Sequence, residues 1–287
     1  MTRTETPAAL IVQGVDVETR ALKMLATFTG ARSIAGLGNG AFRLVEAQPH
    51  EHIAGFCANE KLDWAWVPAT RGLDTLRLAA FDMDSTLITI ECIDELADFA
   101  GCKDKVSEIT AAAMRGELDY PSSLRRRVKL LAGIEATLLE SVYLERLKYS
   151  PGAESLLRRL RALGVRTLLV SGGFTFFTDR VREHLQIDFT RSNTLVIEDG
   201  RLTGELEGDL VDADAKAAEL ASHARDLGIG ASQVLAVGDG ANDLKMMALA
   251  GTSVAWRAKP AVQAAATHAL DHAGLDGVLN LFNPVDR

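Results

Sequence analysis

Two aspartates, Asp82 and Asp84, follow a short apolar run at residues 78–81 and are separated by one residue. The run is typical of a buried strand, in which alternate side chains point to the same side. In open α/β sheets the ligands bind at the carboxyl ends of the strands, which is where this pair falls. Two carboxylates are costly to bury without a partner, and a divalent cation is their natural partner. The pair therefore predicts an acidic metal site.

A second polar cluster follows the apolar run at residues 233–237, in the segment Gly238-Asp239-Gly240-Ala241-Asn242-Asp243. Two acids and an amide exceed what an ordinary helix N-cap requires. We expect Asp239 to share a cation with Asp82, and Asn242 and Asp243 to face the site from the first helical turn.

A third strand, at residues 165–170, leads into Ser171-Gly172-Gly173. Small residues before a helix let backbone N–H groups approach an anion, and Ser171 adds a hydroxyl donor. Taken alone, this pattern is more often a simple turn. The spacing alone does not establish a role for Lys216 either, because a lone lysine among acids is most often a solvated helix residue. A phosphoryl-transfer site, however, needs a fixed cation of this kind.

The elements around these residues predict an α/β fold with a doubly wound, mostly parallel sheet covered by helices on both faces. A tight hairpin is expected around Asp199-Gly200-Arg201, and a helix at residues 152–163. Between Ile88 and Ser150 only helical periodicity occurs, at about residues 93–100, 106–114, 122–131 and 136–147. A crossover needs only about a dozen residues, so the segment at about 90–150 predicts a helical cap over the site.

Residues 1–70 predict a separate small α/β domain of ferredoxin-like type, and residues 73–287 the sheet domain with its cap. Strands are expected at residues 8–13, 42–47 and 64–67, and helices at 17–29 and 51–59, with Asp16 as an N-cap. The segment Pro68-Ala69-Thr70-Arg71-Gly72 is typical of a domain boundary.

Composition limits the classes of function. The chain has 287 residues, 47% of them hydrophobic, and a net charge of −8, which argues against broad binding to nucleic acid or to an acidic membrane. No apolar run approaches the roughly 18 residues of a spanning helix, and no signal peptide is expected at the N-terminus. Cys57, Cys92 and Cys102 lack CxxC spacing and predict free thiols in a reducing compartment. A cytoplasmic protein is therefore expected.

Together these segments resemble the four ordered motifs of the haloacid dehalogenase superfamily, over essentially residues 78–283. The resemblance extends to strings in and around the cap, and is greatest to the members that act on O-phosphoserine. The matching segments are Asp82-Met83-Asp84-Ser85-Thr86, Glu91 with Ile93-Asp94-Glu95-Leu96, Ser123-Leu124-Arg125-Arg126-Arg127-Val128, Ser171-Gly172-Gly173, Lys216 and Gly238-Asp239-Gly240-Ala241-Asn242-Asp243.

The resemblance implies a role for each residue. Asp82 would be the nucleophile that forms an aspartyl-phosphate, and Asp84 the acid and then the base. Mg²⁺ would be held by the Asp82 carboxylate, the Asp84 backbone carbonyl and Asp239. Asp243 would support the metal shell or orient the lysine. The phosphoryl oxygens would be received by Ser171, the Gly172 amide, Lys216 and Asn242.

The resemblance also implies the substrate, a small molecule with an ammonium and a carboxylate. Glu91 would bind the ammonium and Arg127 the carboxylate, whereas Arg125 and Arg126 would stay solvated. Met114 and Tyr120 either line the pocket or pack in the cap core. The implied reaction is the Mg²⁺-dependent hydrolysis of O-phosphoserine, the last step of serine biosynthesis.

Two other functions remain as alternatives. One is a related phosphatase or phosphotransferase that acts on another small phosphomonoester. The other is a phospho-acceptor domain of the receiver type, which also places acids and a lysine at strand ends. A receiver needs a long-lived acyl phosphate and open faces, so Asp84 and the large cap count against it.

Some relatives carry an N-terminal domain of the ACT type, and the loop Gly14-Val15-Asp16 is weakly similar to the corresponding loop of such domains. The first unit would then either bind an effector or serve a structural or dimerising role, which makes a homodimer through this domain a further expectation.

Overall fold

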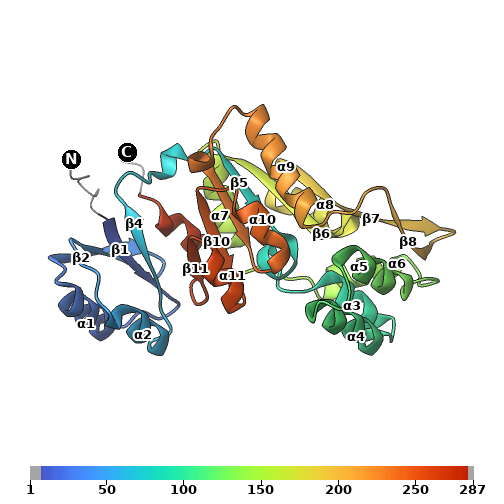
Figure 1. Ribbon diagram of the computed structural model, residues 1–287, viewed down its shortest axis with the longest axis horizontal. Helices are drawn as coiled ribbons and strands as arrows, with labels where there is room; N and C mark the ends of the chain where they lie inside the picture. The colour runs from blue at the N-terminus through green and yellow to red at the C-terminus, as the bar shows by residue number, and fades with distance from the viewer. Residues whose placement is uncertain (1–7, 284–287) are drawn as a thin grey trace.

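A computed structural model describes residues 8–283, which form three parts in a row (Figure 1). A small domain of four strands and two helices lies at one end, a large sheet with helices on both faces lies in the middle, and a group of cap helices lies at the other end. The predicted fold class, a mostly parallel α/β sheet with a helical cap and a small N-terminal α/β domain, is confirmed.

The large sheet has seven strands in the order β11-β10-β9-β5-β6-β7-β8, parallel except for the β7–β8 pair. β5 lies between β6 and β9, with Phe81 in register with Leu169 on one side and Val237 on the other. The chain segments that leave these three strands are therefore neighbours. The strands are β5 (Leu78–Phe81), β6 (Arg166–Phe174), β7 (Phe189–Glu198), β8 (Arg201–Glu207), β9 (Val234–Gly238), β10 (Thr252–Trp256) and β11 (His268–Leu270).

Helices cover both faces of this sheet, and each face has its own apolar core. One core holds Phe81 with side chains of α7 (Ala153–Ala162) and α8 (Thr175–Leu185). The other holds Leu78 with side chains of α9 (Ala213–Asp226), α10 (Leu244–Met247) and α11 (Pro260–Ala265). Because β5 is buried on both faces, its sequence is a continuous apolar run rather than an alternating one.

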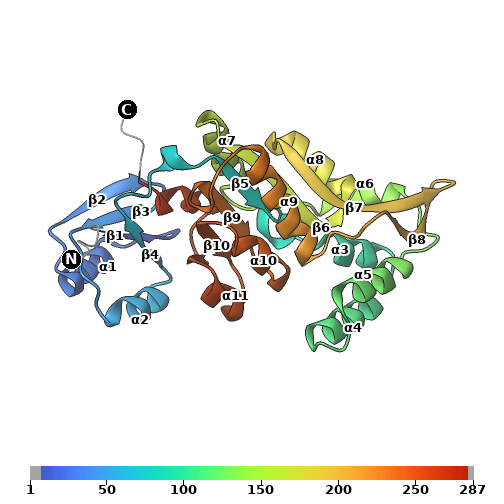
Figure 2. The ribbon, with the colours of Figure 1, turned by 45° about the horizontal axis from the view of Figure 1, so that its top comes forward.

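The cap is inserted between β5 and α7 and lies at the end of the sheet where β5 finishes (Figure 2). The hairpin of β7 and β8 supports it: the Gly133 N–H donates to the Leu202 carbonyl at 2.8 Å, and the Leu202 N–H donates to Ile134 at 2.9 Å. The turn residues Asp199 and Gly200 have φ of 47° and 74°, as the predicted tight hairpin requires. The cap helices are α3 (Cys92–Phe99), α4 (Lys103–Met114), α5 (Tyr120–Lys129) and α6 (Thr137–Glu145).

The small domain is an antiparallel sheet in the order β2-β3-β1-β4, with α1 (Thr19–Thr29) and α2 (His52–Asn59). The strands are β1 (Ala8–Gln13), β2 (Ser33–Gly38), β3 (Ala41–Val45) and β4 (Asp63–Pro68). β2 was not predicted from the sequence, because this edge strand is mostly exposed and contains two glycines and therefore lacks an apolar pattern. The predicted N-cap Asp16 is wrong, since the helix starts at Thr19 after Glu18, whose side chain makes no capping bond.

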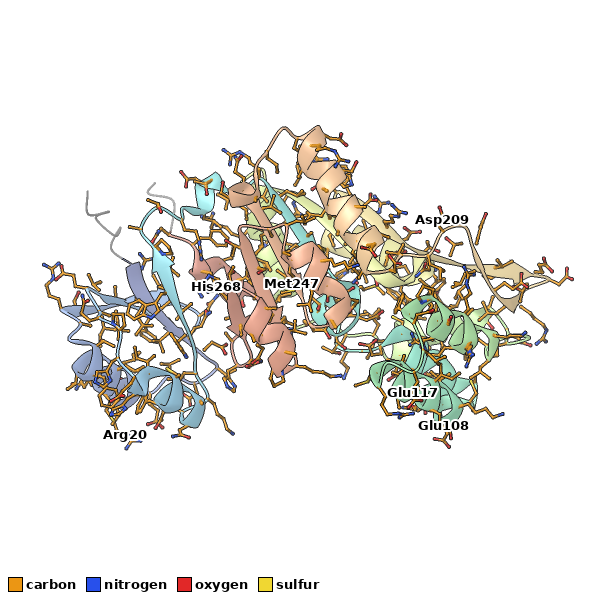
Figure 3. The ribbon with its side chains drawn as sticks, viewed as in Figure 1. Arg20, Glu108, Glu117, Asp209, Met247 and His268 are labelled. Atoms are coloured by element: carbon orange, nitrogen blue, oxygen red, sulfur yellow. The ribbon has the colours of Figure 1, made fainter. Side chains whose placement is uncertain are left out.

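Polar contacts tie the small domain to the end of the chain. The Asp63 carboxylate accepts backbone N–H groups of Asp271 at 2.8 Å, His272 at 3.0 Å and Ala273 at 2.8 Å. Arg71 contacts His268, which Figure 3 shows at the boundary between the two domains. Within residues 8–283, no helix is long and apolar enough to cross a membrane.

Candidate active site

Asp82 lies at the point where β5 ends. Its N–H donates to the Val237 carbonyl of β9 at 3.1 Å, and its Oδ1 accepts the Met83 N–H at 2.7 Å. The strand stops at Phe81, and the chain then makes a turn in which Ser85 has a left-handed φ of 55°. This turn, and not the strand alternation assumed in the sequence analysis, positions Asp84.

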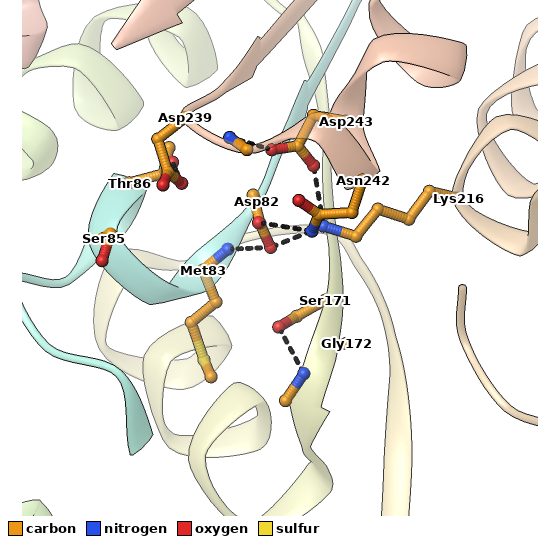
Figure 4. Close-up of polar contacts among 12 residues, drawn as sticks. Asp82, Met83, Ser85, Thr86, Ser171, Gly172, Lys216, Asp239, Asn242 and Asp243 are labelled. Carbon is orange, nitrogen blue, oxygen red and sulfur yellow. Dashed lines mark hydrogen bonds and ion pairs between the residues drawn. The ribbon is translucent and has the colours of Figure 1, made fainter. Parts of the chain in front are cut away.

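Lys216 is buried and contacts two carboxylates (Figure 4). Its Nζ lies 2.8 Å from Oδ1 of Asp82 and 2.8 Å from Oδ1 of Asp243. Asp212 starts α9 by accepting the Ala215 N–H at 2.9 Å, which places Lys216 one turn into the helix. Burial by itself would lower the pKa of Lys216, but the two carboxylates outweigh burial and raise it. Lys216 is therefore a fixed cation, and the solvated interpretation is wrong.

Asp243 orients this lysine. One of its oxygens accepts from Lys216, and the other, Oδ2, accepts the Gly240 N–H at 3.0 Å. Burial first, and repulsion from Asp82 second, raise the pKa of Asp243 to about 6, while Lys216 opposes the shift. A side chain at Gly238 would overlap the Asp243 carboxylate, which explains the glycine that precedes Asp239.

Three carboxylates form a group suited to a cation. Asp82, Asp239 and Asp243 each offer one oxygen, and these atoms all lie within 4.8 Å of one another. Thr86 Oγ1 holds Asp239 by donating to its Oδ1 at 2.9 Å. Burial, followed by repulsion from Asp82 and Asp243, raises the pKa of Asp239 to about 7. An all-oxygen acidic set fits a hard cation such as Mg²⁺, whose charge would relieve this repulsion. The backbone ligand at Asp84 stays a prediction.

Asp84 is the carboxyl group placed beside the nucleophile candidate. Its Oδ1 accepts the Cys92 N–H, at the start of the cap, at 3.1 Å. Burial raises the pKa of Asp84 to about 7, with repulsion from Asp82 adding to the shift and hydrogen bonding to Cys92 opposing it. A carboxyl group that titrates near neutrality can carry a proton in one step and accept one in the next. A Cβ at Gly173 would come within 2.7 Å of Asp84 Oδ2, so this glycine leaves room for the acid.

The predicted phosphate-binding residues Ser171, Gly172, Lys216 and Asn242 lie around Asp82 (Figure 4). Ser171 is buried, and its Oγ accepts the Gly173 N–H at 2.9 Å. The Nδ2 of Asn242 lies 3.4 Å from Asp82 Oδ2. β6 runs through Ser171 and Gly172 to Phe174, and its register with β7 breaks between Val170 and Phe174. The glycines therefore form an irregular part of the strand and not a turn after it.

The resemblance implies two substrate-binding residues in the cap, Glu91 and Arg127. They differ in exposure and in hydrogen bonding. Glu91 is an exposed residue at the start of α3, and its Oε1 accepts the Ser85 hydroxyl at 2.6 Å. Although the residue as a whole is exposed, its carboxyl group is largely desolvated, and this desolvation, followed by repulsion from Asp84, raises the pKa of Glu91 to about 8. Arg127 is half-buried on α5, and its Nε is buried with no hydrogen-bond partner among residues 8–283.

The neighbours Arg125 and Arg126 are exposed, as predicted. Met114 is exposed as well, so it does not pack in the cap core. It is 66% exposed at the end of α4, and its sulfur lies 3.8 Å from Lys259 Nζ. Tyr120 contacts the glycine segment of β6, because its hydroxyl donates to the Gly172 carbonyl at 3.3 Å.

Three residues support the site although the sequence did not predict a role for them. Thr86 holds Asp239, Cys92 holds Asp84, and Asn193 of β7 donates to the Gly172 carbonyl at 2.8 Å. Thr86 belongs to the first motif, so its hydroxyl beside the acids was an available signal. Cys92 acts through its backbone, and Asn193 lies in a strand far along the chain, so neither carries a local signal.

This fold and this site define a class, the haloacid dehalogenase-like hydrolases. The model of that family matches residues 79–248, which is more than half of the chain. A model for a domain of unknown function (DUF4072) matches residues 10–53, within the small domain.

Comparison with known proteins narrows the class. A phosphoserine phosphatase of Polaromonas sp. is 52% identical over 214 residues, which cover 73% of this chain and 91% of that protein. The unliganded crystal structure of a probable phosphoserine phosphatase from Vibrio cholerae superposes with a TM-score of 0.84 at 37% identity, covering 96% of this chain and 86% of the other. A phospho-aspartyl intermediate analogue of phosphoserine phosphatase superposes with a TM-score of 0.68 at 36% identity, over 72% of this chain and 99% of the other. The chain belongs to the phosphoserine phosphatase family and is a phosphoric monoester hydrolase.

Proposed function

We propose that this enzyme hydrolyses O-phosphoserine to serine and phosphate through an aspartyl-phosphate on Asp82, as the last step of serine biosynthesis. The main support for the proposal is the unequal hydrogen bonding of the two carboxylate oxygens of Asp82. Its Oδ1 accepts from Lys216 and Met83, whereas the one hydrogen bond of Oδ2 within residues 8–283 is the 3.4 Å contact with Asn242. One oxygen is thus anchored, and the other is open to react.

In the first step an oxygen of Asp82 attacks phosphorus, and the bond from phosphorus to the serine oxygen breaks. Asp84 gives its proton to the departing serine oxygen, which leaves as a neutral hydroxyl. In the second step Asp84 takes a proton from a water molecule, whose oxygen attacks phosphorus and breaks the bond to Asp82. The pKa of Asp84, raised to about 7, suits both directions of proton transfer. Asp84 ends protonated and ready for another cycle.

Negative charge on the phosphoryl oxygens requires donors around them. Lys216 supplies the buried cation, and Ser171, the Gly172 amide and Asn242 supply hydrogen bonds. The carboxylates of Asp82 and Asp239, with the backbone carbonyl of Asp84, would hold Mg²⁺, which when bound neutralises charge between the aspartate and the phosphoryl group. Asp243 is a positioning residue in this scheme, since both of its oxygens already accept hydrogen bonds.

The cap provides substrate choice in this proposal. Arg127 would bind the substrate carboxylate. Its buried Nε has no partner in the described part of the chain, and this supports the role because buried guanidinium donors are normally satisfied. Glu91 would meet the ammonium. The pKa of Glu91, raised to about 8, means that a cationic partner would draw its carboxyl group into the charged state.

We also propose the domain division at residues 1–70 and 73–287, with the cap at about 90–150. The contacts of Asp63 with residues 271–273 favour a structural role for the small domain. ACT-type effector binding and a homodimer through this domain stay predictions.

The test is steady-state turnover of O-phosphoserine, O-phosphothreonine and an aryl phosphate, each with Mg²⁺ and with a chelator. We expect a clear preference for O-phosphoserine that depends on the metal. Equal turnover of the three would overturn the substrate assignment and favour the alternative, a phosphatase for another small phosphomonoester.

A further inference from the structure

The carbonyl oxygen of Gly172 accepts two side-chain hydrogen bonds, one from the core and one from the cap. Asn193 Nδ2, on β7 of the core, lies at 2.8 Å, and the hydroxyl of Tyr120, at the start of cap helix α5, lies at 3.3 Å. A carbonyl oxygen has two lone pairs, so this acceptor is fully used. At Gly172, therefore, both the core and the cap bind the segment at residues 171–173 that is proposed to bind phosphate.

Asn193 is itself rigidly placed. It is 2% exposed, and its Oδ1 accepts the Val211 N–H at 2.9 Å. Val211 immediately precedes Asp212, the residue that caps the helix carrying Lys216. One amide side chain therefore links the Gly172 peptide to the segment that positions the buried lysine.

The peptide between Gly172 and Gly173 is held at its other end too. Its N–H, on Gly173, donates to Ser171 Oγ at 2.9 Å. Because a peptide group is planar, fixing the oxygen also fixes the direction of the N–H. Ser171 Oγ already accepts one hydrogen bond, so its own proton is free to donate to a phosphoryl oxygen.

Two adjacent glycines would otherwise leave this peptide free to rotate. The closeness of the cap explains why residue 172 is glycine, since a Cβ there would overlap the Tyr120 hydroxyl. We infer that Asn193 and Tyr120 are positioning residues that clamp the Gly172 carbonyl, Asn193 from the core and Tyr120 from the cap, so that both parts of the enzyme order the segment at residues 171–173 that we propose binds phosphate.

The test uses the full chain with three variants and two controls. Asn193→Asp keeps the acceptor for Val211 but replaces the donor to Gly172 with a carboxylate oxygen, and Tyr120→Phe removes only the hydroxyl. The third variant combines both changes. The control for the strand is Thr190→Val, because Thr190 Oγ1 has no hydrogen-bond partner among residues 8–283. The control for the cap is Tyr143→Phe, whose ring on α6 lies near Arg180.

The main readout is the affinity for inorganic phosphate with Mg²⁺ by calorimetry, and kcat and KM for an aryl phosphate are measured beside it. We expect phosphate affinity to fall about fivefold in Tyr120→Phe and at least about tenfold in Asn193→Asp, as loss of a neutral hydrogen bond and its replacement by repulsion imply. Because both donors act on one carbonyl, the double variant should lose less than the product of the single losses.

Affinities in both single variants within twofold of their controls, or losses that multiply fully in the double variant, would overturn the clamp. If Asn193→Asp does not fold, Tyr120→Phe with its control decides alone. The inference rests on the proposed phosphate-binding role of residues 171–173. If these losses are found but the enzyme does not prefer O-phosphoserine, the clamp is supported and the substrate assignment is overturned. Absence of phosphate binding by the unmodified enzyme would overturn the clamp itself.

Discussion

Lys216 Nζ lies 2.8 Å from Oδ1 of Asp243, and both side chains are almost completely buried. The same ammonium lies 2.8 Å from Asp82, so two buried carboxylates share one buried cation. Removal of one partner from a buried ionic group leaves uncompensated charge, which is far more costly than the pair itself is favourable. The lysine is consequently needed for the fold of the site as well as for its chemistry.

The substitution Lys216→Met should therefore lower both stability and activity. Loss of the cation leaves Asp82 and Asp243 facing each other, at a cost of about 3–5 kcal/mol. The measurement is the free energy of unfolding in urea, together with turnover of O-phosphoserine. The matched control is Lys245→Met, because Lys245 pairs with Asp214 at the surface and should change stability by about 1 kcal/mol or less.

Adding Asp243→Asn to Lys216→Met should recover part of the lost stability, because one unpaired charge is removed. Activity should not recover, since the phosphoryl group still lacks its cation. Recovery of turnover in the double variant would contradict the role assigned to Lys216.

The substitution Asp82→Asn should abolish the phosphoenzyme, because an amide oxygen is a poor nucleophile. Rapid-quench measurement with O-phosphoserine should show no burst of serine and no acid-stable phosphate on the protein. Lys216 keeps Asp243 as a partner, so we expect the variant to fold. Asp214→Asn, at an exposed acid, serves as the control and should behave like the unmodified enzyme. A normal burst in Asp82→Asn would overturn the nucleophile assignment.

The sequence predicted the strand ends and the residues at them, because buried parallel strands and acid-rich or glycine-rich segments leave strong local patterns. It did not predict β2, whose residues are exposed at a sheet edge and therefore need no apolar pattern. It also missed contacts between residues far apart in the chain. Asn193 and Gly172 meet only because β6 and β7 are neighbours, and no local pattern encodes that distance.

The stability of the metal-free protein should fall as pH rises. The pKa values of Asp84 and Asp239 are raised to about 7 in the folded protein from an ordinary value of 3.8. A carboxyl group with a raised folded-state pKa favours folding below about pH 4, and this contribution is lost as pH rises through 7. Thermal unfolding with a chelator should therefore show a lower Tm at pH 8 than at pH 5.

Mg²⁺ should reverse this trend, because it binds the charged carboxylates and not the unfolded chain. The rise in Tm on adding Mg²⁺ should be larger at pH 8 than at pH 5. Asp239→Asn should weaken the pH dependence of the metal-free protein and remove most of the Mg²⁺ effect. If Mg²⁺ raises the Tm of Asp239→Asn as much as that of the unmodified enzyme, Asp239 is excluded as a ligand.

The substitution Arg127→Ala should mainly raise KM for O-phosphoserine. Loss of a charge-assisted contact of about 1.5–3 kcal/mol corresponds to roughly a 10- to 100-fold loss in affinity for the carboxylate. An aryl phosphate without a carboxylate should be affected little. The exposed neighbour Arg126→Ala is the control on the same helix. Equal losses on both substrates in Arg127→Ala would place this arginine outside the specificity pocket.

The contact of Asp63 with the end of the chain predicts a change in stability without a change in chemistry. Asp63→Ala leaves the N–H groups of residues 271–273 without their acceptor, at a cost of about 2–3 kcal/mol. In a chain of this size each ~1 kcal/mol moves Tm by roughly 2–4 °C. Asp63→Asn keeps one acceptor oxygen and should lose less. Asp16→Ala, an exposed acid of the same domain, is the control and should leave Tm unchanged. At 25 °C all three variants should retain the kcat and KM of the unmodified enzyme, because Asp63 contacts none of the residues around Asp82. A parallel loss of activity in Asp63→Ala at a temperature where the protein is folded would show that the small domain takes part in catalysis, and would contradict its structural role.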